Sequence, residues 1–212
     1  MRKHLASMIP NDPVGVGNAA DPYAAYLVYD TFTDTNATAL ADHTPDKDTE
    51  AGGWAVRAGT WEVNNNRGNV SAVAGTATAV INCGVANVVV TTTAKAPNGA
   101  GVDVSGIVVR EADINNMILS RLRPKIDTVD VYSVIAGGWA SLGSVAFDST
   151  RGTDYELEFS YGAGGAWSYS VDEIEKLSGT NNILGTNTNI GLLQHNGTND
   201  DDCFDDFRAV AL

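Results

Sequence analysis

Hydrophobic and polar residues alternate along this chain in short runs that turn residues separate. Between residues 155 and 161, Tyr155, Leu157, Phe159 and Tyr161 occupy every second position, with polar or acidic residues between them. A period of two indicates a β-strand, and such runs recur at about 8–12-residue spacing. The pattern predicts roughly a dozen short strands and no convincing helix. We therefore expect an all-β fold, a two-sheet antiparallel sandwich of the jelly-roll type.

The two ends of the predicted domain carry similar strands. Residues 199–212 begin as an acidic loop and finish as an apolar strand, and residues 27–34 have the same character. A strand that ends the domain must pair into a sheet, so we expect these two strands to lie together with their aspartates at one rim. Residues 1–26 hold three prolines and no sustained periodicity, which indicates an extended arm before a domain spanning 27–212. The arm either attaches to a partner or is a frayed terminus.

Composition limits the classes of ligand. The 212 residues suffice for one all-β domain, and the formal net charge is −13. Such a charge argues against nucleic acid and against anionic membranes, because both need a basic face. It fits an extracellular or particle-exposed protein and divalent-cation binding, or it serves solubility alone.

The two cysteines and the apolar segments say little about the function of the protein. Cys83 and Cys203 either form a single disulfide or are small buried hydrophobes. No stretch approaches the ~20 apolar residues of a membrane span. The basic start has no apolar segment after it, so we expect no secretory signal; incorporation into a virus particle is another route out of a cell.

In their order along the chain, several short motifs resemble one family. The chain is similar to the concanavalin A-like lectin/glucanase jelly roll, in the laminin-G-like branch that is found in bacteriophage virion proteins. The resemblance covers about residues 27–212. The motifs are Tyr29–Phe32, His43–Asp46, Gly53-Trp54, Gly59–Val63, Gly106–Arg110, Asn115-Asn116, Tyr155–Asp172, Ile190–Leu192 and Phe204–Phe207. The family implies two short antiparallel sheets packed face to face, and many members bind sugars.

Candidate sugar-binding residues combine aromatic rings with polar side chains. Trp139 and Trp167 lie next to glycine-rich turns, where a ring can be exposed for stacking on a sugar, whereas Trp54 and Trp61 have the pattern of core residues. Arg110 and Asn116 hold central positions in the family pattern. The alternative for the tryptophans is a place in the core, and for the polar pair a structural hydrogen bond across the sheet.

The acidic C-terminal region is the candidate metal site. Ca²⁺ binds six to eight oxygens, and jelly rolls of this family can hold a structural calcium where the first and last strands meet. By the resemblance Asp205 is the best position, with Asp206, Asp30 and Asp34 as partners. The alternative is an acidic loop whose carboxylates bind backbone groups.

No catalytic motif stands out. Retaining glucanases of this fold carry Glu-x-Asp-x-x-Glu on one strand, with carboxylates about 5–5.5 Å apart, and the chain has no such motif. Glu156 and Glu158 share one strand face, where we expect solvated outer positions. We therefore predict no catalytic residues and no enzyme activity.

Three functions follow, in order of preference. The first is a non-enzymatic structural, decoration or fibre protein on the surface of a phage particle, attached to other virion proteins through its arm and forming symmetric oligomers, for example trimers. The second is a carbohydrate-binding module for host or environmental glycan, which would act outside cells. The third is a glycoside hydrolase or polysaccharide lyase.

Overall fold

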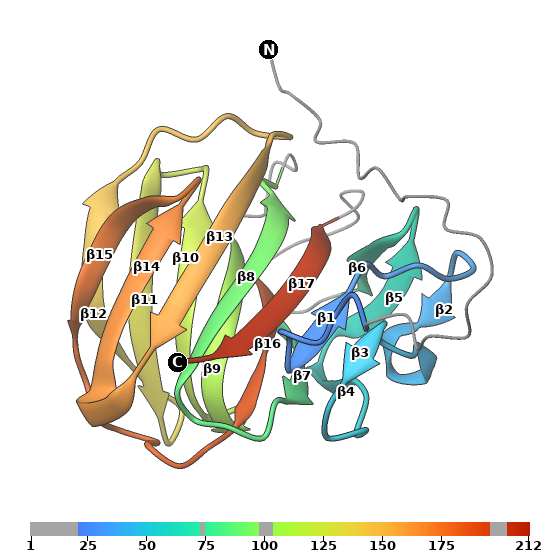
Figure 1. Cartoon of the computed structure of the whole chain (residues 1–212). Coiled ribbons are helices and arrows are strands. Elements are labelled where there is room, and N and C mark those ends of the chain that lie inside the picture. The colour runs from blue at the N-terminus through green and yellow to red at the C-terminus, as the bar shows by residue number, and fades with distance from the viewer. Residues whose placement is uncertain (1–20, 73–74, 98–103, 196–202) are drawn as a thin grey trace, which may run out of the picture.

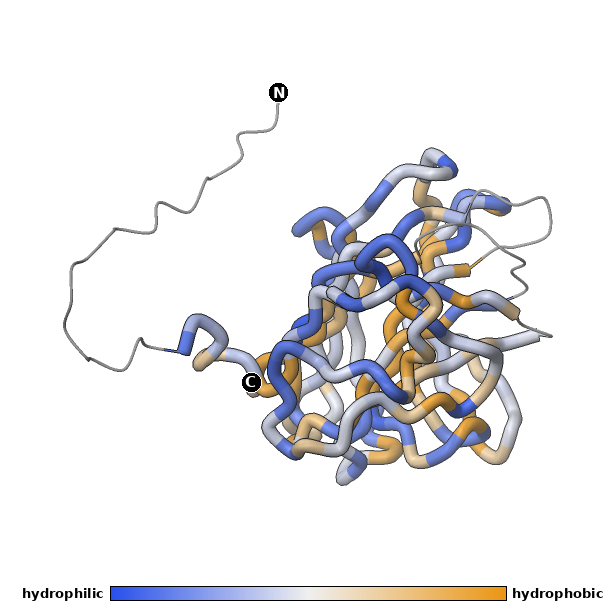
Figure 2. Tube along the Cα trace, turned by 90° about the vertical axis from the view of Figure 1, so that its right-hand side faces the viewer, coloured by the Kyte–Doolittle hydropathy of each residue, from blue (hydrophilic) through white to orange (hydrophobic). Residues whose placement is uncertain are grey.

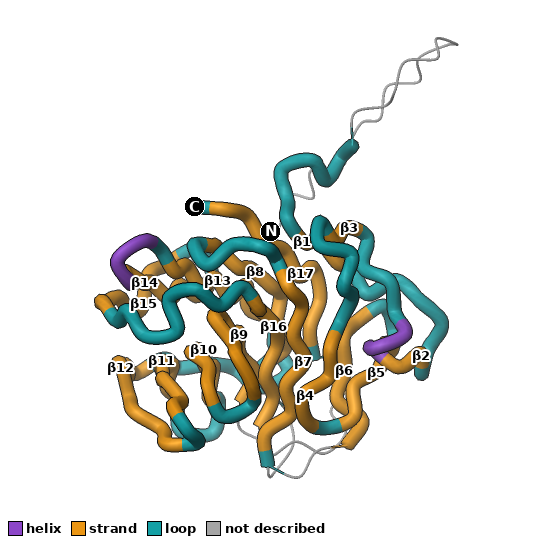
Figure 3. Tube along the Cα trace, turned by 90° about the horizontal axis from the view of Figure 1, so that it is seen from below, coloured by secondary structure: helices purple, strands orange, loops and turns teal. Residues whose placement is uncertain are grey.

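Two antiparallel sheets packed face to face form the body of the protein (Figures 1 and 3). The computed structural model describes residues 21–72, 75–97, 104–195 and 203–212. The expected all-β sandwich is therefore confirmed. None of the helices in these ranges is long enough to cross a membrane.

The larger sheet, sheet A, has ten strands and lies in front in Figure 1. Eight of them follow the order β15-β14-β13-β8-β17-β6-β5-β2, while β1 pairs with β17 and with β3. Their bounds are β1 Val28–Asp30, β2 Thr38–Ala39, β3 Lys47–Asp48, β5 Thr60–Asn64, β6 Arg67–Ala72, β8 Val88–Lys95, β13 Asp154–Tyr161, β14 Ala166–Val171, β15 Ile174–Thr180 and β17 Phe204–Ala211.

The second sheet, sheet B, lies behind with seven strands in the order β12-β11-β10-β9-β16-β7-β4. These are β4 Ala55–Ala58, β7 Thr76–Asn82, β9 Val104–Asp113, β10 Asn116–Arg123, β11 Thr128–Ile135, β12 Gly138–Ala146 and β16 Asn189–His195. Two short 3₁₀ turns, η1 (Leu40–Asp42) and η2 (Ala163–Gly165), complete the elements of the described ranges.

The core lies between the sheets because one face of most strands is apolar. In β13, Leu157, Phe159 and Tyr161 are fully buried, as their alternation predicts. Trp54 and Trp61 are also buried, which confirms their expected place in the core. Figure 2 shows many hydrophobic residues within the body of the molecule, while several of its outer turns are hydrophilic.

The predicted pairing of the two terminal strands is confirmed. β1 runs antiparallel to β17, with Val28 opposite Ala209 and Asp30 opposite Phe207 (Figure 1). The last strand also pairs with β8, so it lies inside sheet A. In sheet A, β17 therefore lies between β1 and β8.

Turns precede β1 at the N-terminal boundary of the domain. Residues 1–20 lie outside the described residues, so the expected arm stays a prediction there; residues 21–26 form turns that pack on the sandwich, with Tyr23 and Tyr26 stacked on Tyr29. Cys83 and Cys203 are buried thiols and form no disulfide.

Candidate functional site

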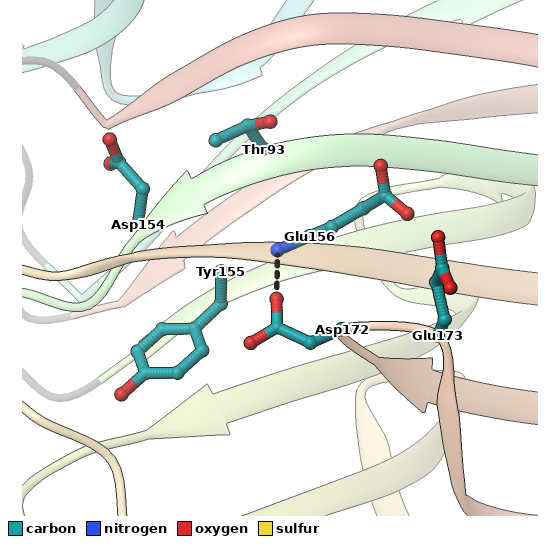
Figure 4. A pocket seen from close by; sticks show the side chains of 6 residues that line it. All are labelled: Thr93, Asp154, Tyr155, Glu156, Asp172 and Glu173. Carbon is teal, nitrogen blue, oxygen red and sulfur yellow. Dashed lines mark hydrogen bonds between the residues drawn. The ribbon is translucent and has the colours of Figure 1, made fainter. Parts of the chain in front are cut away.

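A polar region lies on the outer face of sheet A. It consists of two shallow cavities of about 320 and 600 Å³ that both contact Thr93 on β8. The smaller cavity, shown in Figure 4, is lined by Thr93, Asp154, Tyr155, Glu156, Asp172 and Glu173. The larger one is lined by Tyr29, Thr31, Thr33, Asn65, Asn66, Arg67, Thr93, Asp205 and Asp206. We call the two cavities together the groove.

Strand register brings the central side chains of the groove together. Thr93 lies directly opposite Glu156 on β13 and directly opposite Asp205 on β17. Directly opposed residues of neighbouring strands point to the same side of a sheet. The same alternation that buries Leu157 and Phe159 therefore places the intervening polar residues of β13 on the outer face.

Two arginines pair with carboxylates that line the cavities; Arg67 itself lines the larger cavity, whereas Arg208 lines neither. A guanidinium nitrogen of Arg67 lies 3.0 Å from Asp154 Oδ1, and Arg208 Nη2 lies 2.8 Å from Glu156 Oε2. Arg208 Nη1 also approaches Asp206 Oδ2 at 3.2 Å. Ion pairs at this level of exposure contribute only about 0–1 kcal/mol to stability. Their main effect is to hold charged groups at fixed places on rigid strands.

A tight turn forms one end of the groove. Asp172 and Glu173 connect β14 to β15 with φ values of 50° and 64°, the left-handed region that a two-residue hairpin turn requires. Asp172 Oδ1 accepts a hydrogen bond from the backbone N–H of Glu156 at 3.0 Å (Figure 4). The turn is thereby fixed to β13, and the carboxylate of Glu173 faces that of Glu156 across the cavity (Figure 4).

Tyrosine rings form the other end. Tyr29 belongs to β1, which lies between β17 and β3. Its ring stacks with those of Tyr23 and Tyr26 at centroid distances of 4.6 and 5.2 Å. Burial, together with the charge of Asp206 and a hydrogen bond to it, raises the pKa of Tyr29, so its phenol stays protonated. Burial also raises the pKa of Asp205, although Arg67 opposes this shift.

This arrangement suits recognition of hydroxyl groups. Carboxylates accept hydrogen bonds, guanidinium groups donate them, and Thr, Asn and Tyr side chains do both. Among the residues that the structure describes, no group of three or more His, Cys, Asp or Glu side chains is placed to hold a metal ion.

Trp139 and Asn116 lie on sheet B instead. Trp139 is 43% exposed on the edge strand β12, with its ring edge-to-face against Tyr132 at 5.8 Å. Arg121 lies over both rings, at 4.2 Å from Tyr132 and 5.4 Å from Trp139. Asn116 Oδ1 accepts a hydrogen bond from Ala136 N in the neighbouring hairpin. Trp139 is thus an exposed ring, whereas Asn116 connects two turns.

Trp167 and Arg110 are not open to a ligand, which corrects the expectation for both. Trp167 is 4% exposed because it shares the buried face of β14 with Tyr169. Arg110 is 2% exposed, lies over the Tyr161 ring at 4.1 Å and donates to Ala86 O and Gly162 O. Its role is the alternative weighed above, a structural contact between strand ends.

The four candidate calcium ligands divide into two sets, so the expectation that the aspartates of the first and last strands meet at one rim is wrong. Asp30 is fully buried and accepts hydrogen bonds from Phe32 N, His43 Nε2 and Trp54 Nε1 at 2.7–2.9 Å. Asp34 binds the other nitrogen of His43. Asp205 and Asp206 instead line the groove. The acidic stretch 199–202 lies outside the described residues, so calcium binding stays a prediction.

Sequence reasoning missed most of the groove. Arg67, Thr93, Asp154 and Arg208 come from four strands that are distant in sequence. The sequence holds one signal for the groove. Polar residues alternate with apolar ones between residues 155 and 161, and this alternation places Glu156 on the outer face of the strand.

Solved structures show the fold. No protein-family model and no curated protein matches the chain. A carbohydrate-binding module, CBM66 from Bacillus subtilis, superposes with a TM-score of 0.59 at 14% identity, covering 74% of this chain and 95% of that one. A Bacillus subtilis protein of unknown function with a galectin-like fold gives 0.58 at 12% identity, with 88% and 96% covered. A point mutant of the Emp46p carbohydrate recognition domain gives 0.56 at 11% identity, with 82% and 95% covered. The chain therefore has a jelly-roll fold of the galectin-like kind.

Proposed function

We propose that this protein is a carbohydrate-binding module and that the groove on sheet A holds the glycan. The observation that carries the proposal is the groove itself: ion-paired carboxylates and arginines, with hydroxyl and amide side chains, on the strands β6, β17, β8 and β13 and on the turns beside them. Fixed donors and acceptors lose little conformational freedom on binding, which favours recognition of a polyhydroxyl ligand.

The similar structures support the same class of ligand. Two of the three solved structures compared above are named for carbohydrate binding or recognition. They favour the carbohydrate-binding alternative over a virion structural role and over catalysis. The phage particle, the laminin-G-like branch and the lack of enzyme activity stay predictions.

The test is a glycan array followed by titration calorimetry with the glycan bound best. We expect the Arg208→Gln variant to lose about tenfold or more in affinity, or about 1.4 kcal/mol, because Arg208 positions Glu156 and Asp206, which line the two cavities. Arg57→Gln is the matched control: Arg57 pairs with Glu111 on sheet B, away from the groove. It should lower the melting temperature and leave affinity unchanged.

Two outcomes would contradict the proposal at different levels. Absence of binding to every glycan on the array and to insoluble polysaccharides would refute the function. Loss of binding in Trp139→Ala, with Arg208→Gln unaffected, would keep the function and move the site to the exposed ring of β12.

A further inference from the structure

The groove is longer than a site for one sugar needs. Its lining extends from Arg67 on β6, over β17 and β8, to Glu156 on β13 and then to the turn that holds Glu173. Neighbouring strands lie about 4.8 Å apart, so the steps from β6 to β13 alone span about 14 Å. The groove therefore crosses the strands and exceeds the width of a single sugar ring.

Thr93 on β8 lines both cavities, and two ion pairs join strands on either side of β8. Arg67 reaches from β6 to Asp154, and Arg208 reaches from β17 to Glu156, so both ion pairs pass over β8. A guanidinium group has five N–H donors in a planar fork, more than one carboxylate can use. Each arginine pairs with two carboxylates, Arg67 with Asp154 and Asp205, and Arg208 with Glu156 and Asp206. A ligand that occupies both cavities would meet these ion pairs at its middle.

The charge of the groove limits the chemistry of that ligand. The two cavities are lined by one guanidinium group, that of Arg67, and by six carboxylates, those of Asp154, Glu156, Asp172, Glu173, Asp205 and Asp206. The whole chain carries a formal charge of −13. Like charges brought together at an interface are unfavourable and slow the encounter. Uronic acid and sulfated polysaccharides are therefore disfavoured.

We infer that the ligand of the groove is an uncharged glycan chain of several units, which lies across the strands and occupies both cavities. This inference rests on the proposed function and specifies its substrate class. Neither recognition of a single terminal sugar nor recognition of an acidic polysaccharide fits the length and the charge of the groove.

The experiment measures affinity against chain length and charge. The probes are cello-, xylo- and fructo-oligosaccharides of one to six units, the uncharged polysaccharide bound best on the array, and polygalacturonate as the acidic polymer. Within the series that binds, we expect the Kd to fall by about tenfold or more from the shortest to the longest chain. Polygalacturonate should not compete at low salt.

Variants at the two ends locate the chain. Glu173→Gln replaces one carboxylate oxygen by an amide NH₂ at the turn end, and Asn66→Ala removes the side-chain amide at the other end. Each should weaken binding of the longest chain several-fold. Glu175→Gln is the matched control, because Glu175 is exposed on the same hairpin and lines neither cavity.

The possible failures can be told apart. Equal affinity for one unit and for six, or tighter binding of polygalacturonate than of every uncharged chain, would overturn this inference and leave glycan binding in place. Loss of binding in Arg208→Gln, without any effect of the two end variants, would confine the ligand to the middle and also overturn it. Only the absence of all glycan binding removes the proposed function.

Discussion

His43 is the residue on which the buried polar network beneath β1 depends. Its Nε2 lies 2.9 Å from Asp30 Oδ1 and its Nδ1 lies 3.1 Å from Asp34 Oδ2, while its own side chain is only 3% exposed. Both ring nitrogens can donate only when the imidazole is protonated. Burial opposes the charged form, but the hydrogen bonds and charges of Asp30 and Asp34 outweigh it and raise the pKa of His43.

The raised pKa predicts a stability that falls at alkaline pH. A group whose pKa is higher in the folded state stabilises fully below its unfolded value, about 6.5 for histidine, and loses that contribution as pH rises through the folded value. Urea unfolding of the wild type from pH 5.5 to 9 should show this loss. His43→Gln should flatten the profile and cost about 3 kcal/mol at pH 6, because it leaves the buried Asp30 without its charged partner. An unchanged profile in the variant would show that another group causes the loss.

Residue patterns predict burial better than they predict function. Trp54 and Trp61 are recognisable as core residues from the sequence, whereas Trp167 is expected at the surface because glycines precede it. Its alternation with Tyr169 and Val171, all three buried, is the stronger signal. The structural role of Arg110 is hidden in the sequence because its partners, Ala86 and Gly162, belong to loops distant from it.

The pairing of the first and last strands can be predicted from the sequence, but the shortest strands cannot. The pairing of β1 with β17 follows from two similar apolar strands at the two ends of the domain. The strands β2 and β3 have two residues each. Two residues cannot show a period, so only tertiary contacts define such strands. The groove could not be predicted for a related reason, because it depends on which strands become neighbours.

Sheet B contains a close approach that only glycine permits. A Cβ built on Gly191 of β16 would overlap with the backbone oxygen of Ala79 on β7. We expect Gly191→Ala to destabilise the protein by about 3 kcal/mol or more, at the upper end of the range for overpacking, because backbone atoms must move. Gly52→Ala is the control, since nothing lies within 4 Å of its Cβ. Urea midpoints compare the two, and equal midpoints would mean that β16 shifts without cost.

At the scale of the whole molecule, the net charge of −13 opposes folding. Self-repulsion of like charges destabilises a compact state, and salt weakens it because the screening length falls from about 30 Å at 0.01 M to about 8 Å at 0.15 M. Salt also weakens surface ion pairs such as Arg67–Asp154, but such pairs contribute only about 0–1 kcal/mol each. The excess of repulsive over attractive charge pairs should decide whether salt stabilises or destabilises the folded protein.

We therefore expect sodium chloride to stabilise the protein. Raising it from about 10 to about 200 mM should increase the melting temperature by about 2–4 °C, which corresponds to about 1 kcal/mol for a domain of this size. Sodium chloride is the suitable salt, because sulfate stabilises proteins through exclusion from their surface. The same salt titration distinguishes the effect of the acidic surface on stability from its effect on binding. The affinity for an uncharged glycan should change little over this range, whereas the melting temperature rises. A melting temperature that falls with salt would show that attractive pairs, such as those in the groove, outweigh the net charge.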